Sequence, residues 1–239
     1  MLKGANVAQQ VKSKERVADH GEVFTNEREV NAMLDMVKQE TERIDSRFLE
    51  PACGDGNFLA EILRRKLAIV KQRYGKSVSE YEKYCFVAVA SIYGVELLQD
   101  NAADCRTRLF DIVEGEYMKI CKKKPNPKFL PAIQFVIQRN ILCGDALTLL
   151  QDDGEPIIFS EWSMAMGIKV KRRDFRLDEM LEGNVVEPAL LLQLKNLHHP
   201  EAARLQLQED PLRLREAHPA AIKNLPQTPM GEATLQIHL

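Results

Sequence analysis

The chain has 239 residues, of which 45% are hydrophobic and 28% are charged, and its formal net charge is -2. This composition is typical of a globular protein, and the small net charge excludes a general attraction to nucleic acid, so any such contact must come from local basic segments. The apolar runs are too short to cross a bilayer and the N-terminus is polar, so we expect a cytoplasmic protein without membrane contact. The five cysteines are scattered without a CxxC pair, which predicts reduced thiols and no metal site.

The N-terminal part is predicted to be helical. Residues 1–20 are polar and mixed in charge, and they could form a loosely attached helix. Asn26 and Glu29 then have the spacing of a capping box, and apolar residues follow at helical spacing. We therefore expect a helix over about 27–41 and an N-terminal helical segment over 1–45.

Alternating strands and helices predict an α/β domain over 46–167 with a parallel sheet. The segment "YGKSVSEYEKY" is either a polar connection or the end of a helical hairpin. The following run, "CFVAVASIYGVELL", is interpreted as a buried strand. Strands are predicted at 47–50, in the apolar run ending near Glu96, at 140–143 and within "EPIIFSEWS", with helices over 58–74 and 97–120.

The character of the sequence changes after about Gly167. "KVKRRDFRLDEMLEG" could form one basic strand or a short helix, and the sequence from Asn184 onward is rich in proline without a strand-like run. We expect 168–239 to be a basic segment and a Pro-rich tail that is poorly ordered or depends on a partner. The sheet would then be incomplete in its C-terminal half, and the tail could instead come from a truncated or shifted reading frame.

The first predicted strand runs into a glycine-bearing turn, "EPACGDGNFL". In an open parallel sheet, ligands bind beyond the carboxyl ends of the strands, and Gly54 and Gly56 let the backbone approach a ligand closely. Glu50 and Asp55 flank the turn, which suits a cationic or hydroxyl-bearing ligand better than a pyrophosphate. Leu59 occupies the third glycine position of GxGxxG, so a dinucleotide site is disfavoured. The alternative is a tight turn whose glycines serve packing alone.

Two further acids follow predicted strands. Glu96 ends the second strand, where acids of nucleotide-binding α/β folds bind ribose hydroxyls, although an enlarged first crossover is needed to bring it there. Asp145 follows the third strand. Each acid alone could be a solvated turn residue, but three strands that end in carboxylates favour a nucleoside ligand.

Four motifs in this order resemble the S-adenosylmethionine-binding half of adenine-N6 DNA methyltransferases, in particular the modification subunits of restriction–modification systems. They are "GEVFTN", "EPACGDGNFL", "YGVEL" and "ILCGDAL", within about Val11 to Ser163. The resemblance implies a Rossmann-like class I methyltransferase fold with a mostly parallel sheet, in which 46–167 binds S-adenosyl-L-methionine. It also implies that Glu96 lies on the cofactor ribose and Asp145 near its adenine, while the family usually has proline where this chain has Asn26. The implied cofactor-binding residues are Phe24, Thr25, Glu50, Pro51, Gly54, Asp55, Gly56, Glu96 and Asp145.

The family's catalytic motif, Asn/Asp-Pro-Pro-Tyr/Phe, is not found in the sequence. The Asn-Pro pair at Asn126 precedes the third motif, so its order is wrong. "IIFSEWS" occupies the expected place and offers Ser160, Glu161 and Trp162 as catalytic candidates without a proline pair. Trp162 could stack on a flipped base, or it could be an ordinary half-buried aromatic residue.

Two basic segments could contact DNA phosphates, or could simply be solvated. They are "KICKKKPNPK" and "KVKRRDFR". The second follows the expected catalytic edge, so we take Lys169, Lys171, Arg172 and Arg173 as candidate DNA-binding residues. The expected partners are double-stranded DNA and a specificity, restriction or second methyltransferase subunit.

These features support three hypotheses of function. The first is an S-adenosylmethionine-dependent methyltransferase acting on adenine N6 in DNA within a restriction–modification system. The second is a catalytically silent cofactor-binding subunit, or a truncated remnant, that needs a partner chain. The third is a methyltransferase of RNA or a small molecule, which needs no fixed catalytic motif.

Overall fold

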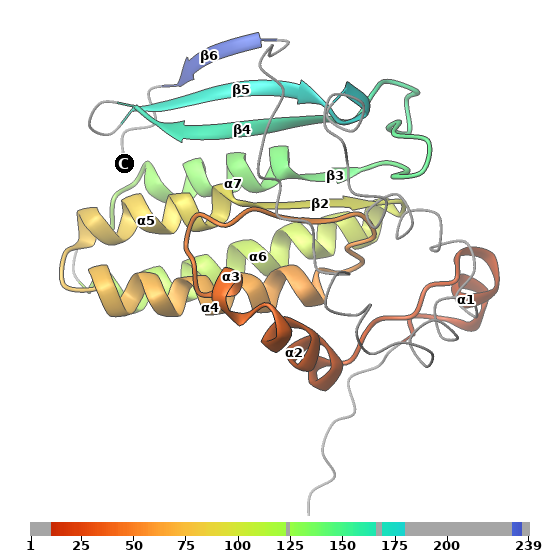
Figure 1. Ribbon diagram of the computed structural model, residues 1–239, viewed down its shortest axis with the longest axis horizontal. Coiled ribbons are helices and arrows are strands. Elements are labelled where there is room, and N and C mark those ends of the chain that lie inside the picture. Colours follow the sequence, from red (N-terminus) through yellow and green to blue (C-terminus); the bar gives the residue numbers. More distant parts are fainter. Residues whose placement is uncertain (1–10, 123–124, 166–168, 180–230, 236–239) are drawn as a thin grey trace, which may run out of the picture.

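The computed structural model describes residues 11–122, 125–165, 169–179 and 231–235 (Figure 1). Within these residues, no helix combines the length and apolar character needed to span a membrane. The elements in chain order are α1 (Lys14–His20), α2 (Glu27–Met36), α3 (Lys38–Thr41), β1 (Phe48–Glu50), α4 (Asn57–Tyr74), α5 (Val78–Ala90), β2 (Ile92–Glu96), α6 (Gln99–Ile120), α7 (Phe129–Asn140), β3 (Ile141–Cys143), β4 (Ile158–Met164), β5 (Val170–Arg176) and β6 (Gly231–Leu235).

The centre of the fold is a three-stranded parallel sheet in the order β1-β2-β3. This confirms the predicted α/β class and parallel sheet. Because the strands lie side by side in chain order, right-handed crossovers place both sets of connecting helices on the same face. The packing agrees, since Phe48, Ile92 and Ile141 belong to the large apolar core that the helices α4 to α7 complete.

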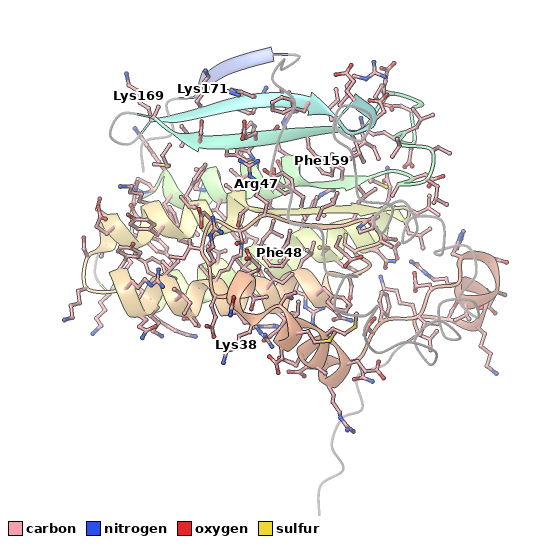
Figure 2. All side chains as sticks on the ribbon, viewed as in Figure 1. Lys38, Arg47, Phe48, Phe159, Lys169 and Lys171 are labelled. Carbon is pink, nitrogen blue, oxygen red and sulfur yellow. The ribbon has the colours of Figure 1, made fainter. Side chains whose placement is uncertain are left out.

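A second, antiparallel sheet in the order β4-β5-β6 covers the other face of the parallel sheet. Side chains alternate along a strand, so Leu49 and Tyr93 point away from the helices and pack near Phe159 in a smaller core. The rings of Tyr93 and Phe159 meet edge to face with centroids 5.4 Å apart. Figure 1 shows this second sheet on the side opposite α4 and α6, and Figure 2 shows Phe48 and Phe159 on the two sides. One end of β4 also packs against α5 and α7, where Trp162 meets Phe86 and Phe135 edge to face.

The predicted boundaries differ from the structure at several elements. The run before Glu96 is helical up to Ala90, so α4 and α5 form the hairpin that was the alternative interpretation, and β2 is shorter than predicted. The predicted helix over 27–41 is divided at Val37 into α2 and α3. The predicted helices over 58–74 and 97–120 and the strands at 47–50 and 140–143 are confirmed as α4, α6, β1 and β3.

The C-terminal part also differs from the prediction. The basic segment forms a strand, β5, which confirms one of its two predicted forms. The expectation that no strand follows Asn184 is wrong, because β6 pairs with β5. The fourth strand joins this antiparallel sheet and does not extend the parallel one, and the predicted division after 167 falls between β4 and β5. The rest of the predicted tail lies outside the described residues.

Candidate functional site

The acids that follow the three parallel strands lie at one edge of the sheet. Glu50 is opposite Gly94 in the β1–β2 register, and Glu96 is opposite Cys143 in the β2–β3 register. The Gly144 amide donates to the Glu96 carbonyl at 2.9 Å, which joins the turn containing Asp145 to the end of β2. The three predicted acids are thus brought to the edge where ligands of parallel sheets bind.

The turn after β1 depends on both of its glycines. The Cys53 amide donates to the Val95 carbonyl at 2.9 Å, so the chain stays against β2 as the turn begins. Gly54 and Gly56 have φ values of 55° and 90°, in the left-handed region that favours glycine. A Cβ atom would lie 3.1 Å from the Phe24 ring at Gly54 and 2.7 Å from the Cys105 Sγ at Gly56. The glycines therefore serve packing as well as conformation, and Phe24 from the N-terminal motif covers the turn.

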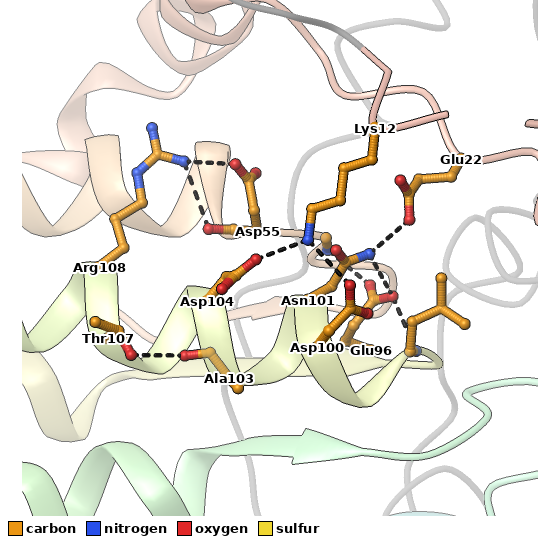
Figure 3. Close-up of polar contacts among 12 residues, drawn as sticks. Lys12, Glu22, Asp55, Glu96, Asp100, Asn101, Ala103, Asp104, Thr107 and Arg108 are labelled. Carbon is orange, nitrogen blue, oxygen red and sulfur yellow. Dashed lines mark hydrogen bonds and ion pairs between the residues drawn. The ribbon is translucent and has the colours of Figure 1, made fainter. Parts of the chain in front are cut away.

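Glu96 links the end of β2 to this turn. Its Oε2 accepts a hydrogen bond from the Gly54 amide at 2.8 Å, and its Oε1 accepts from the Leu98 amide at 3.1 Å and from Asn101 Nδ2 at 3.3 Å (Figure 3). The side chain is buried, with 7% of Glu96 exposed. An ionised carboxylate has about four acceptor positions, so these three bonds leave capacity for a ligand.

Glu50 carries a half-buried carboxyl group that receives few hydrogen bonds from the described residues. Its Oε1 accepts only a long bond of 3.5 Å from the Ala52 amide, and no cation in the described part of the chain pairs with it. Burial raises the pKa of Glu50 to about 7, and the Ala52 amide opposes that rise. A cationic ligand at this position would favour the ionised form.

Asp55 lies between the two glycines and beside a cleft. Burial raises its pKa, and the nearby Arg108 opposes the rise; Arg108 Nη1 lies 3.3 Å from Asp55 Oδ2 and donates to Asn57 Oδ1 at 2.6 Å. Asp55 Oδ1 is buried and has no partner among the residues with described positions. This cleft is a shallow depression between α4 and α6 that is wide open to solvent, with a volume of about 510 Å³, and it is lined by Asp55, Arg64, Asp104, Thr107, Arg108, Asp111 and Ile112.

Asp145 is held by its own turn, and Thr25 is held by the start of α4. Asp145 Oδ1 accepts from the Leu147 amide at 2.8 Å and the residue is half-buried. The Thr25 carbonyl accepts from Asn57 Nδ2 at 3.1 Å, which fastens the N-terminal motif to the start of α4. Asn26, at the position where the family usually has proline, caps α2 by accepting from the Glu29 amide at 3.0 Å.

The structure adds residues that were not predicted. Asn101 Nδ2 donates to Glu22 Oε2 at 2.9 Å as well as to Glu96, so two carboxylates share one amide group. Glu22 also pairs with Arg16 at 2.6 Å. The contact between Glu22 and Asn101 joins positions 79 residues apart, and no local pattern in the sequence indicates it.

The three catalytic candidates on β4 do not lie at this edge of the sheet. Glu161 pairs with Arg47 at 2.6 Å, and Arg47 precedes β1. Trp162 Nε1 donates to Asn140 Oδ1 at 2.8 Å, and Asn140 precedes β3, so both candidates face the starts of the parallel strands. Trp162 is 9% exposed and belongs to the core, so it is a packed aromatic residue that is buried more deeply than the half-buried alternative expected. Ser160 Oγ donates to Asp174 on the neighbouring strand at 2.7 Å.

Three of the candidate DNA-binding residues lie on β5 and Lys169 directly precedes it, and acids accompany Arg172 and Arg173. Arg172 pairs with Asp174 at 2.9 Å, and Arg173 lies 3.7 Å from Glu161. Lys169 and Lys171 point outward near the start of the strand (Figure 2). The local charge of the strand is therefore partly balanced within its own sheet.

Comparisons with known proteins give no match to a family model, a curated protein or a solved structure. The chemistry of the site must then be inferred from its donors and acceptors. Acceptors predominate at this edge, because the side chains of Glu22, Glu50, Asp55, Glu96 and Asp145 all carry carboxyl groups. Such a set suits a ligand with hydroxyl donors and positive charge, and it repels phosphate.

Proposed function

We propose that this chain binds S-adenosyl-L-methionine at the carboxyl ends of β1, β2 and β3 and acts in an adenine-N6 DNA methyltransferase of a restriction–modification system. The observation that carries the proposal is the hydrogen bond from the Gly54 amide to Glu96 Oε2. It joins the acid after the second strand to the glycine turn after the first, which is the arrangement in which α/β folds bind a nucleoside. The strand order is also compatible with a Rossmann-like class I methyltransferase fold.

The residues at the edge fit this cofactor, which carries an ammonium group, a sulfonium cation and ribose hydroxyls. Glu50, with a raised pKa and a single long hydrogen bond among the described residues, would meet the ammonium group, and Glu96 would accept from the ribose. Asp55 Oδ1 is a further buried acceptor near the turn, with no partner in the described residues. Asp145 would lie near the cofactor adenine, as the resemblance implies.

When bound, the cofactor supplies a methyl group activated by its sulfonium charge. The contribution of this chain is to hold the cofactor in one orientation and to exclude water from it. The Phe24 ring, which packs on Gly54, covers the turn, and the acids fix the two ends of the ligand. Positioning of this kind can supply much of the rate of a group transfer.

A catalytically silent cofactor-binding subunit is the second candidate, favoured by one observation. Glu161 and Trp162 on β4 contact residues at the starts of the parallel strands, away from the glycine turn. In that case the groups that hold the adenine base would come from a partner chain. Both the active enzyme and the silent subunit could contact DNA phosphates through Lys169 and the basic residues of β5.

The test is calorimetric titration of the full chain with S-adenosylmethionine. Glu96→Gln should weaken binding at least tenfold, because it removes a buried charged acceptor, whereas Asp153→Asn at an exposed loop position should leave it unchanged. Absence of binding by the folded wild-type chain would overturn the proposal.

A methyl-transfer assay with labelled cofactor then separates the candidates. Transfer to duplex DNA by this chain alone supports the enzyme, and cofactor binding without transfer supports the silent subunit. Preferential transfer to RNA or to small molecules contradicts the DNA substrate.

A further inference from the structure

Residues 11–25, here called the N-terminal strap, lie against the candidate cofactor site and are tied to it by ion pairs (Figure 3). Lys12 pairs with Asp100 at 3.2 Å and with Asp104 at 2.7 Å, both near the start of α6. Arg16 pairs with Asp100 at 2.6 Å. At the other end of the strap, Phe24 packs on Gly54. The strap therefore connects the glycine turn to the start of α6.

Between these anchors, the strap inserts a buried acid beside Glu96. The Glu22 side chain is 7% exposed and Asn101 is 1% exposed. Glu22 Oε2 accepts from Arg16 and from Asn101, but Glu22 Oε1 and Asn101 Oδ1 are buried and unpartnered as far as the described residues go. A buried polar atom without a partner destabilises the fold, so two such atoms in one cluster indicate that something else supplies the hydrogen bonds.

The orientation of the Asn101 amide follows from its neighbours. Its nitrogen donates to Glu22 and to Glu96, and a reversed amide would turn its oxygen toward both carboxylates. The two unpartnered atoms, Glu22 Oε1 and Asn101 Oδ1, are therefore hydrogen-bond acceptors, and a ligand that binds them must supply hydrogen-bond donors. Arg16 already balances the charge of Glu22, which favours a neutral donor such as a hydroxyl group over a second cation.

We propose that Glu22 is a ligand-binding residue of the strap, which together with Asn101 and Glu96 accepts hydrogen bonds from the ribose hydroxyls of the bound nucleoside. This inference rests on the proposed function and extends it to the specificity of the site. Lys12 and Arg16 pair with Asp100 and Asp104, but the carboxylates of this cluster outnumber its cations once Glu22 and Glu96 are included. The edge therefore keeps a net negative charge, and the closed strap selects nucleosides that lack a 5′-phosphate. The strap thus both covers the ligand and contributes to the specificity of the site.

The experiment measures binding of four probes to the full-length chain: S-adenosylmethionine, adenosine, 2′,3′-dideoxyadenosine and adenosine 5′-monophosphate. Glu22→Gln keeps the size of the side chain and removes its charge, and Glu15→Gln on exposed α1 is the matched control. We expect Glu22→Gln to weaken S-adenosylmethionine about tenfold. We also expect it to reduce the preference for adenosine over dideoxyadenosine, with Glu15→Gln unchanged and the monophosphate bound more weakly than adenosine by every variant.

A purely structural role for Glu22 predicts a different result. Loss of its pairing with Arg16 would weaken adenosine and dideoxyadenosine equally, and that outcome overturns the inference while leaving the proposed function intact. Equal binding of the monophosphate and adenosine overturns the selection against phosphate. If the wild-type chain binds none of the probes, the inference and the proposed function both fail.

The wild-type chain offers a second measurement that does not depend on the folding of a variant. Trypsin cleaves after Lys14 and Arg16, which lie in the strap. Adenosine at saturation should slow this cleavage several-fold, and dideoxyadenosine at saturation should protect less. Equal protection by the two nucleosides would contradict hydroxyl recognition by the strap.

Discussion

Glu50 is the residue at the site whose charge should change near neutral pH. Its pKa is raised to about 7 by burial, from an ordinary value of 4.5. Because a cationic ligand binds the ionised form, we predict that affinity for S-adenosylmethionine rises as the pH increases from 5.5 to 7.5 and then levels off. Below pH 7 the slope should approach tenfold per pH unit.

Calorimetric titrations at pH 5.5, 6.5 and 7.5 test this dependence, with Glu50→Gln as the matched variant. The variant should bind weakly and with little pH dependence, and an unchanged slope in Glu50→Gln would assign the titration to another group. The same shift affects folding. The folded chain binds this proton more tightly than the unfolded chain does, so the contribution of Glu50 to the free energy of unfolding falls as the pH rises from about 4.5 to about 7.

Lys66 is a fully buried cation at the opposite edge of the sheet. Its Nζ donates to the Ser46 carbonyl and to Ser91 Oγ and lies 5.0 Å from the Phe48 ring centroid. Burial lowers its pKa to about 7, from 10.5. Between pH 7 and about 10.5, the Lys66 side chain is therefore protonated in the unfolded chain and largely neutral in the folded chain. The free energy of unfolding should rise with pH across this range.

Urea denaturation at pH 7, 8 and 9 tests the Lys66 prediction. The wild-type free energy of unfolding should gain up to about 1.4 kcal/mol per pH unit, and Lys66→Met should abolish most of that gain. Lys76→Met, at an exposed position, should retain it. A wild-type stability that does not increase over this range would contradict the lowered pKa.

The candidate site could be predicted from the sequence only where a local rule applies. Glu50, Glu96 and Asp145 each follow a strand, and the topology of a parallel sheet brings such residues together. Glu22 and Asn101 were not predicted as site residues because their contact depends on how the N-terminal strap folds back over α6. Arg108 was missed for the same reason, since its contact with Asp55 joins two elements that are distant in the sequence.

At the scale of elements, the sequence predicted a strand where the buried apolar run before β2 forms the end of a helix, α5. The run over 85–90 contains mainly apolar residues, and such a run fits a buried strand or a buried helix equally well. In the structure α5 begins earlier, at a cap where Ser77 accepts from the Glu80 amide at 3.4 Å, and its periodicity continues through the run. The amphipathic pattern of α4 is clearer, and that helix was predicted to within one residue.

Gly56 should be the residue on which the junction between β1 and α4 depends most. Its φ of 90° is strained for any other residue, and a Cβ atom would lie 2.7 Å from Cys105 Sγ on α6. We predict that Gly56→Ala lowers the free energy of unfolding by about 2–4 kcal/mol.

Gly115→Ala provides a control of opposite sign. Gly115 lies within α6, and a Cβ atom added there would meet open space, so alanine should raise stability by about 0.5–1 kcal/mol. Chemical denaturation of both variants measures the two effects. A loss below about 1 kcal/mol for Gly56→Ala would show that α4 and α6 can move apart without strain.

At the scale of the whole molecule, the order of the parallel strands explains why a second sheet is needed. Both crossovers place helices on one face, so the face that carries Leu49, Tyr93 and Val95 must be covered by another part of the chain. The sequence indicates β4 and allows β5 as a strand, but it does not say which strands they pair with. The sequence therefore predicted β4, left β5 as a strand or a short helix, and missed β6 and the separate antiparallel sheet.

Phe159 tests whether this second sheet stabilises the whole fold. It is 2% exposed, meets Tyr93 edge to face, and belongs to the core between the two sheets. We predict that Phe159→Ala lowers the free energy of unfolding by about 3–5 kcal/mol, measured by urea denaturation. Ser163→Ala, at an exposed position of the same strand, should change it by less than about 0.5 kcal/mol. If Phe159→Ala costs no more than the control, the antiparallel sheet adds nothing to the stability of the parallel one, and the face of Leu49 and Tyr93 must be covered in another way.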